Sequence, residues 1–339
     1  MDMRELNRWF EKNQRDFPWR KDRNPYKVWV SEVMLQQTRA SVVVPYFNRW
    51  IRLFPNVKAL AAASVEEVIK TWEGLGYYSR ARNLHRAAAT ILEKYGGEIP
   101  ETEDELMGIH GLGPYTVSAI LSFGFKKRKA AVDGNVTRVL ARFFSLKENT
   151  CKQSVKRKIQ KGADALLDSD EPWVSSEALI ELGAKVCTPK PRCESCPLQE
   201  NCLGKEIAET LPIKNPRKKV SKIRRAVIIF ESSGKVLLKK GELGKVMADL
   251  YEFPYFEMGS EIWPCTKVIR AIRKTFRFHV EKAEKLKKVQ HTFTRYKAEL
   301  FPFRFQMEVP HKVDGYQWVD EDQIERLPFS SGHRKILSL

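Results

Sequence analysis

The 339-residue sequence lacks any run of about 18 apolar residues, which excludes a helix that spans a membrane. Residues 1–6 contain no apolar core of the kind found in a secretion signal. We therefore expect a cytoplasmic, nucleoid-associated protein with no membrane partner. The chain is also too long for one typical hydrophobic core, so two or three domains are expected.

The sequence is short of acidic residues relative to basic ones. It has 42 Asp and Glu against 60 Lys and Arg, which leaves a formal net charge of +18. A soluble protein this basic usually binds a polyanion, so the charge favours a nucleic-acid partner. The alternative on charge alone is a basic surface that only keeps the protein in solution.

Strand-like alternation is nearly absent from residues 1–207, where capping boxes and apolar spacing indicate helices. Residues 208–222 are rich in Pro, Lys and Arg, a composition typical of a linker. Beyond it, short apolar runs at 225–230 and 235–238 indicate a pair of strands. The sequence thus predicts a multidomain chain, with an all-α region at 1–207, a basic linker at 208–222 and an α+β domain at 223–339.

Four of the six cysteines are clustered with the spacing C-x5-C-x2-C-x5-C: Cys187, Cys193, Cys196 and Cys202. Thiolates this close in sequence can hold one metal centre, either an iron–sulfur cluster or zinc. Zinc sites usually pair two CxxC arms across a longer stretch, whereas this loop contains one CxxC, so the spacing favours iron–sulfur. A disulfide framework is not expected in a long cytoplasmic chain.

A Gly-x-Gly turn at Gly111 and Gly113 joins two predicted helices, and Pro114 follows at the start of the second. Glycines let backbone N–H groups approach a phosphate, and the following helix directs its positive end at the same anion. A helix–hairpin–helix element binds DNA in this way without reading its sequence. The same residues also fit a simple helix–helix turn.

Two carboxylates are candidates for chemistry. Glu32 lies in residues 26–38, which are apolar on nearly all sides, and burial would raise the pKa of Glu32 until it could donate a proton near neutral pH. Asp133 begins a predicted helix, either as a simple N-cap or as a carboxylate directed at a substrate cation. The residue pattern leaves both questions open, since Glu32 could instead reach solvent or an arginine.

Several stretches together resemble the MutY-type adenine DNA glycosylases of the helix–hairpin–helix superfamily. The matching stretches are Pro18-Trp19-Arg20, 30–38, 74–84, the hairpin, 132–136, 181–184 and 251–254. The resemblance covers almost the whole chain and is most specific over its first 205 residues. It implies a six-helix barrel module at about 22–130, an iron–sulfur cluster module formed by 1–21 and 131–207, and a Nudix-like domain at 223–339 that recognises 8-oxoguanine.

The resemblance also implies an activity, because this family removes adenine opposite 8-oxoguanine by hydrolysing its N-glycosidic bond. Glu32 would protonate N7 of an adenine flipped out of the duplex, and Asp133 would stabilise the oxocarbenium-like sugar. The implied partner is double-stranded DNA with adenine mispaired with 8-oxoguanine or guanine. We expect the protein to act on it as a monomer.

Further roles carry over by position. Tyr115 stands where bifunctional relatives carry a nucleophilic lysine, and a phenol cannot form a Schiff base, so hydrolysis without strand cleavage is implied. Asn135 is implied to support the sugar and Asp133. The residues implied to contact adenine are Trp19, Arg20 and Glu177, and those implied to contact DNA are Gln37, Tyr77, Gly111 and Gly113. For Trp19 and Tyr77 the alternative is core packing.

The resemblance also has departures. The four cysteines match the ligands of a 4Fe–4S cluster, but the first gap has five residues where the family usually has six. The recognition loop that commonly reads Phe-Ser-His is here Phe293, Thr294 and Arg295, and a permanent cation in place of an imidazole leaves the preference for 8-oxoguanine over guanine open. The acidic Nudix signature is missing, which argues against pyrophosphate hydrolysis.

Two other functions compete with this one. An endonuclease-III-like glycosylase and lyase that acts on oxidised pyrimidines would share the cluster and the hairpin. It would need a lysine at the position of Tyr115, and it does not explain the C-terminal domain. A non-catalytic iron–sulfur protein that binds DNA would keep duplex binding without Glu32 and would release no base.

Overall fold

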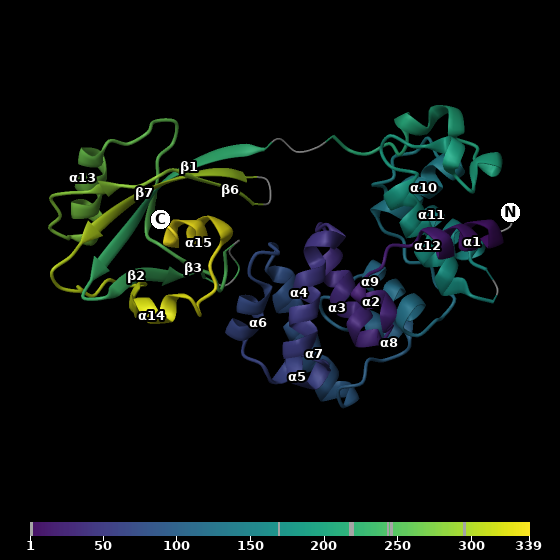
Figure 1. Cartoon of the computed structure of the whole chain (residues 1–339), viewed down its shortest axis with the longest axis horizontal. Coiled ribbons are helices and arrows are strands. Elements are labelled where there is room, and N and C mark those ends of the chain that lie inside the picture. The colour runs from purple at the N-terminus through teal and green to yellow at the C-terminus, as the bar shows by residue number, and fades with distance from the viewer. Residues whose placement is uncertain (1–2, 169, 217–219, 243, 245–246, 294–295) are drawn as a thin grey trace. The chain divides into compact units, whose positions relative to one another are not determined.

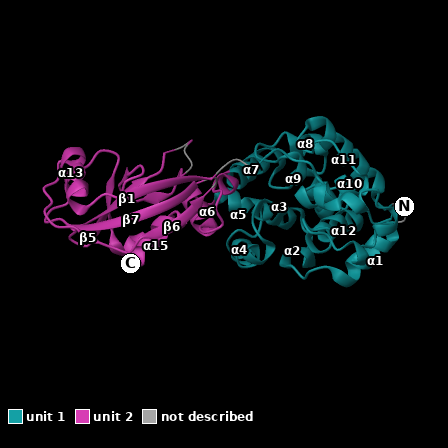
Figure 2. Ribbon diagram, turned by 90° about the horizontal axis from the view of Figure 1, so that it is seen from above, with its two compact units in different colours: residues 1–62, 83–217 teal, residues 63–82, 218–339 magenta. Residues whose placement is uncertain are grey.

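The computed structural model describes residues 3–168, 170–216, 220–242, 244, 247–293 and 296–339. Its contacts divide the chain into two compact units, coloured teal and magenta in Figure 2. Unit 1 comprises residues 1–62 and 83–217, and unit 2 comprises residues 63–82 and 218–339. Each unit is described on its own below, with the element labels of Figure 1.

All regular secondary structure in the described residues of unit 1 is helical. Its elements are α1 (Met3–Asn13), α2 (Pro18–Lys21), α3 (Pro25–Leu35), α4 (Ala40–Leu53), α5 (Val57–Ala62), α7 (Ser79–Tyr95, from Asn83 onward), α8 (Glu103–Met107), α9 (Pro114–Ala119), the π-helix η1 (Ile120–Gly124), α10 (Gly134–Phe143), α11 (Gln153–Leu166), α12 (Pro172–Lys185) and the 3-10 helices η2 (Cys193–Ser195), η3 (Gln199–Asn201) and η4 (Lys205–Thr210). The predicted all-α region is confirmed in this unit.

The central helix of one half of unit 1 is α3. It begins where the Asn24 side chain accepts a hydrogen bond from the Tyr26 N–H at 2.9 Å, with Pro25 in the first turn. Its buried residues point in all directions, as in Val28, Val30 and Val33, because α3 packs against α4, α9 and η1 at once. An ionisable residue on such a helix is removed from water.

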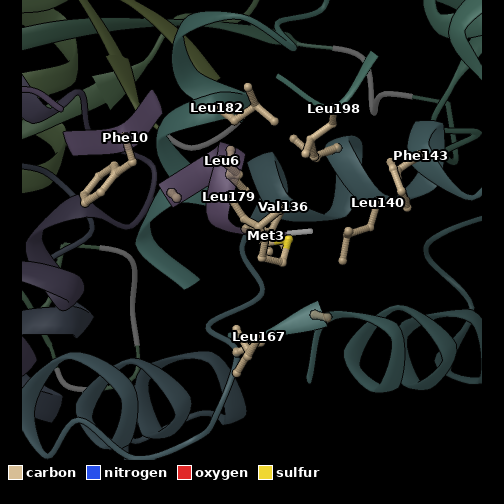
Figure 3. Close-up of a cluster of buried hydrophobic side chains, with 14 of the residues drawn as sticks. Met3, Leu6, Phe10, Val136, Leu140, Phe143, Leu167, Leu179, Leu182 and Leu198 are labelled. Atoms are coloured by element: carbon tan, nitrogen blue, oxygen red, sulfur yellow. The ribbon is translucent and has the colours of Figure 1, made fainter. Parts of the chain in front are cut away.

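The other half of unit 1 is held by a core between α1, α10 and α12, shown in Figure 3. Leu6, Leu140 and Leu182 are fully buried in it, one from each helix. Burying a leucine side chain stabilises the fold by about 2 kcal/mol. This core therefore holds α10 and α12 in a fixed position relative to each other.

Unit 2 is an α+β domain, which confirms the prediction of a sheet domain after the helical region. Its elements are β1 (Ser221–Ser232), β2 (Lys235–Lys240), β3 (Tyr251–Glu252), β4 (Tyr255–Glu257), β5 (Glu284–Lys285), β6 (Val289–Phe293), β7 (Tyr296–Gln306), β8 (Gln317–Asp320), α6 (Val65–Trp72), α13 (Cys265–Phe276), α14 (Glu321–Ile324) and α15 (Ser331–Leu337). The predicted linker 208–222 overlaps η4 at its start and β1 at its end.

The sheet of unit 2 is mixed, since β1 pairs parallel with β7 and antiparallel with β2. Alternate residues of β1 enter two different cores: Val227 and Ile229 face one, and Ile228 and Phe230 face the other. The first core includes Ile336 of α15, and the second is covered by α13. A strand buried on both faces explains the continuous apolar run in its sequence. None of the described helices is both long and apolar enough to cross a bilayer.

Close packing of α12 on α10 gives the first prediction. A Cβ atom added at Gly183 of α12 would lie 2.6 Å from the Asn135 Cβ atom and 3.1 Å from the backbone of that residue. Gly183→Ala should therefore push the helices apart and lower the free energy of unfolding by about 1–3 kcal/mol in urea denaturation. Gly134→Ala, where no atom lies within 4 Å of the new Cβ, is the matched control. Equal stabilities of the two variants would contradict this packing argument.

Candidate active site

Unit 1 contains a cavity of about 1090 Å³ that collects side chains from distant parts of the sequence. The residues singled out from the sequence that line it are Trp19, Arg20, Glu32, Gln37, Tyr115, Asp133, Asn135 and Glu177. They come from α2, α3, the residues after α3, α9, α10 and α12. The structure thus brings the two candidate carboxylates to one cavity.

Glu32 lies on the buried face of α3 with 7% of its surface exposed. Burial, with smaller contributions from the nearby carboxylates of Asp133 and Glu177, raises the pKa of Glu32 to about 7. The Tyr115 hydroxyl donates a hydrogen bond of 2.5 Å to the Glu32 Oε2 atom, which acts in the opposite direction. A carboxyl with this pKa is present in both its acid and its base form near neutral pH, so it can give and take a proton.

Asp133 is the N-cap of α10. Its Oδ1 atom accepts hydrogen bonds from the backbone N–H groups of Asn135 at 2.8 Å and Val136 at 2.7 Å. Its Oδ2 atom accepts a third from the Asn135 side-chain amide at 2.8 Å. Burial nevertheless raises the pKa of Asp133 above its ordinary value. The plain N-cap interpretation and the catalytic one are therefore compatible, since the same carboxylate caps a helix and faces the cavity.

Trp19 lies in the cavity wall and stacks on Phe17, with ring centroids 4.7 Å apart. Several ion pairs between arginines and carboxylates lie near it. Arg20 donates to Glu177 Oε1 at 3.1 Å and to Glu181 Oε2 at 2.8 Å. Glu181 was assigned no role from the sequence. The sequence could have indicated this residue, because a second carboxylate one turn after Glu177 on an apolar helix requires a cation to pair with when it is buried.

Glu181 is fully buried and its charge is held by two arginines. Arg15 donates to its Oε1 atom at 2.6 Å, in addition to the bond from Arg20. Although burial acts to raise it, the pKa of Glu181 is lowered overall by these two cations. Arg23 forms a further ion pair with Glu177 at 2.8 Å, so each of the two carboxylates of α12 is paired with arginine.

Arg138 connects the cavity to the cysteine loop and also went unnoticed in the sequence. Its guanidinium donates to Asn135 Oδ1 at 2.9 Å, to the Gly183 carbonyl at 2.7 Å and to the Cys187 carbonyl at 2.7 Å. Asn135 in turn donates to Asp133. The arginine thus orients the amide that holds the cavity carboxylate.

The four clustered cysteines line one small hollow apart from the cavity. The fully buried Arg142 donates to the Cys187 Sγ atom at 3.3 Å and to the carbonyl groups of Thr188 and Pro189. Burial raises the pKa of the Cys196 thiol to about 11. No trio of His, Cys, Asp or Glu in the described part of the chain lies close enough to hold a single metal ion. Four sulfur atoms thus line one hollow beside a guanidinium.

Gly111 and Gly113 of the hairpin lie outside the cavity lining, whereas Pro114 and Tyr115 belong to it. Gly111 has a φ of +93°, and a Cβ atom there would lie 2.8 Å from the Asn83 Cβ atom, so both the conformation and the space require glycine. Gly113 is the N-cap of α9, which Pro114 begins. Gln37 lies in an exposed position after α3 with a φ of +57°.

The remaining predicted DNA contacts belong to unit 2. Tyr77 is 40% exposed and has a φ of +49°, so it is not a core residue. Phe293 ends β6, with its ring 5.2 Å from that of His291. Thr294 and Arg295 lie outside the described residues.

Comparisons with known proteins identify both parts of the chain. Residues 30–164 match the HhH-GPD superfamily of base excision DNA repair proteins, and residues 225–339 match the NUDIX domain. An adenine DNA glycosylase of Rattus norvegicus is 43% identical over 209 residues, which cover 59% of this chain and 40% of the rat protein. One of Buchnera aphidicola subsp. Baizongia pistaciae is 32% identical over 261 residues, covering 76% of this chain and 74% of that protein. The chain therefore spans less than half the length of the rat relative.

Solved structures show a related fold. A thermostable thymine-DNA glycosylase is 25% identical, with a TM-score of 0.55, over 60% of this chain and 95% of its own. A trapped endonuclease III–DNA covalent intermediate is 26% identical, with a TM-score of 0.52, over 60% of this chain and 94% of its own. The similarity extends over more than half of this chain in both cases.

The hydrogen bond between Tyr115 and Glu32 gives the second prediction. Tyr115→Phe keeps the burial but removes the donor that stabilises the Glu32 carboxylate, so the pKa of Glu32 should rise above about 7. Carbon-13 NMR titration of labelled glutamate would measure it, with the Glu32→Gln spectrum assigning the signal. An unchanged or lower pKa would mean that the phenol does not stabilise the charged form.

Proposed function

The chain belongs to the adenine DNA glycosylase family, and from this membership we propose that it hydrolyses the N-glycosidic bond of adenine mispaired with 8-oxoguanine or guanine in DNA. The observation that carries the proposal is the pair Glu32 and Asp133 on one cavity, the first with a pKa of about 7. Glycoside hydrolysis commonly uses two carboxyl groups whose different environments give them different pKa values.

Adenine has to leave the base stack before its glycosidic bond can be reached. The cavity wall formed by Trp19 offers an apolar face to a flipped base. Arg20 and Glu177 offer a donor and an acceptor beside it. The ion pairs that surround these two side chains hold them in place, so that the polar edge of adenine is met by oriented groups.

Glu32 acts as the general acid in this proposal. It transfers its proton to N7 of adenine, and the base then leaves as a neutral molecule while the C1′–N9 bond breaks. The Glu32 carboxylate formed in this step then accepts a proton from water as the water oxygen bonds to C1′. The products are free adenine and an abasic deoxyribose, and Glu32 has regained its proton.

Asp133 stabilises the positive charge that develops at the sugar while the bond breaks. Its carboxylate is oriented by two backbone donors and by the Asn135 amide, so it needs no rearrangement during the reaction. Tyr115 supports Glu32 through its hydroxyl. A tyrosine here cannot form the Schiff base of a lyase, so the proposed enzyme does not cut the strand.

The cysteine loop is proposed to hold a 4Fe–4S cluster through Cys187, Cys193, Cys196 and Cys202. The fit rests on four sulfur donors that line one hollow beside Arg142. A bound cluster would cross-link the loop and keep the Cys187 carbonyl in place for Arg138. We therefore assign the cluster a structural role.

Recognition of the opposite base is assigned to the exposed DNA contacts rather than to the cavity. Tyr77 and Gln37 would wedge into the duplex, because both are exposed on strained turns. Gly111 and Gly113 would hold the phosphate backbone. Phe293, at the end of β6, would lie against the 8-oxoguanine, and Thr294 and Arg295 follow it in the sequence.

Base release from four duplexes tests the proposal. Adenine opposite 8-oxoguanine and opposite guanine should be released in single-turnover reactions, with strand breaks only after alkali. Adenine opposite cytosine and thymine glycol opposite adenine should stay intact. Glu32→Gln should still bind the mispaired duplex but lose about a hundred- to ten-thousandfold in rate, because the proton donor is gone.

Glu93→Gln, at an exposed position of α7, serves as the control and should keep the wild-type rate. Release of thymine glycol with spontaneous strand breakage would point to an endonuclease-III-like lyase instead. Binding without any base release would point to a non-catalytic DNA-binding protein.

Iron content tests the cluster. Purified protein should contain about four iron atoms per chain and absorb broadly near about 400 nm. Cys196→Ser should lower the iron content, whereas Cys151→Ser, an exposed cysteine outside the hollow, should leave it unchanged. A colourless protein with one zinc ion per chain would overturn the assignment.

A further inference from the structure

Helix α6 and the loop after it belong to unit 2 and are coloured with it in Figure 2, and their side chains contact the C-terminal part of that unit. The contacts are made by residues spaced along this segment, namely Glu66, Lys70, Glu73, Tyr78 and Arg82. Tyr77, the proposed wedge, lies within the same segment. The segment that carries the wedge is therefore attached to the domain proposed to read the lesion.

Glu73 is the centre of these contacts. Its carboxylate accepts two hydrogen bonds from the Arg334 guanidinium, at 2.7 Å from Nε and 3.1 Å from Nη2. It also accepts from the Phe329 N–H at 3.2 Å and from the Lys70 ammonium at 2.7 Å. Its side chain is 14% exposed. A bidentate and partly buried pair of this kind is stronger and more directional than a surface ion pair.

Tyr78 binds the carbonyl group of Phe329, the residue whose N–H is bound by Glu73. Its hydroxyl donates to the Phe329 carbonyl at 3.3 Å and accepts from the Gly74 N–H at 3.2 Å. Both backbone groups of Phe329 are thus bound by side chains that flank the Gly74–Tyr77 turn. The Phe329 ring is fully buried in the core that α15 and the sheet share. The turn is consequently anchored to a rigid point.

The anchor is connected by direct packing to the strand that ends at Phe293. Arg334 lies on α15, and α15 packs against β6. A Cβ atom at Gly332 of α15 would lie 3.0 Å from the His291 Cβ atom, so the helix and the strand are in close contact. The His291 ring stacks on that of Phe293. The helix that carries Arg334 is therefore packed directly against the strand that ends at Phe293.

We propose that Glu73, Tyr78, Phe329 and Arg334 form a latch that holds the wedge residue Tyr77 and the end of β6 at Phe293 as one body. The proposal rests on the proposed function, since it assigns the latch to discrimination of 8-oxoguanine from guanine opposite adenine. Glu73 and Arg334 are positioning residues, because they act through Tyr77 and Phe293. Arg82, which donates to the Ala248 carbonyl at 3.0 Å, closes the far end of the same contact.

A double-mutant cycle tests the latch in the full-length protein. Glu73→Ala and Arg334→Met should each reduce the preference for adenine opposite 8-oxoguanine over adenine opposite guanine by about tenfold in kcat/KM. In the double variant this preference should fall no further than in either single variant, because the two residues form a single interaction. The single-turnover rate at saturating enzyme should stay within about twofold of wild type, since the cavity is not altered.

Glu261→Ala is the matched control, because it removes an exposed ion pair with Lys267 in the same unit and should leave the preference unchanged. Glu73→Gln, which keeps an acceptor for the Phe329 N–H but loses the charge, should lie between Glu73→Ala and wild type. Unchanged preference in the single variants, or losses that multiply in the double variant, would overturn the latch.

Hydrogen exchange separates failure of the latch from failure of the proposed function. The Phe329 amide should exchange faster in both Glu73→Ala and Arg334→Met than in wild type and in Glu261→Ala. If wild-type protein released no adenine from any duplex, the proposed function would fail and this exchange would still decide on the latch. Equal protection of the Phe329 amide in all four proteins would refute it.

Discussion

The burial of one carboxyl group on an apolar helix is the constraint on which the rest of the site depends. Glu32 is enclosed because α3 packs on α4, α9 and η1 at once, and the loss of water raises its pKa to about 7. In an exposed position the same side chain would be ionised and could not act as an acid at neutral pH. The Tyr115 hydroxyl limits the shift by favouring the charged form, so that both protonation states remain accessible.

A buried acid can be maintained only if the charges around it are balanced. Arg20 lies between Glu177 and Glu181, and Arg15 holds the far side of Glu181, so that no carboxylate of α12 is left without a cation. Arg138 donates a hydrogen bond to the side-chain oxygen of Asn135 and so orients that amide. These ion pairs leave the polar groups of the cavity fixed before a substrate arrives, which is the condition for electrostatic stabilisation of a transition state.

The division of the chain into two units separates two tasks. The chemistry proposed for Glu32 and Asp133 belongs to unit 1, whose cavity is lined by residues of α3, α9, α10 and α12. Tyr77 belongs to unit 2 although it lies among residues of the helical region in sequence. In the proposed mechanism, Tyr77 is positioned by the Nudix-like domain through Glu73 and Arg334, and the cavity of unit 1 has no part in distinguishing the opposite base.

The sequence by itself determined the features that depend on local pattern: an all-α region followed by an α+β domain, the buried helix around Glu32, the Gly111 turn and the spacing of the four cysteines. Only the tertiary structure decided that Glu32 and Asp133 share a cavity, that Arg15 pairs with Glu181 across 166 residues, and that Arg334 pairs with Glu73 across 261. The physical reason is that periodicity and capping are set by neighbouring residues, whereas a long-range ion pair leaves no periodic trace in either of the segments that form it.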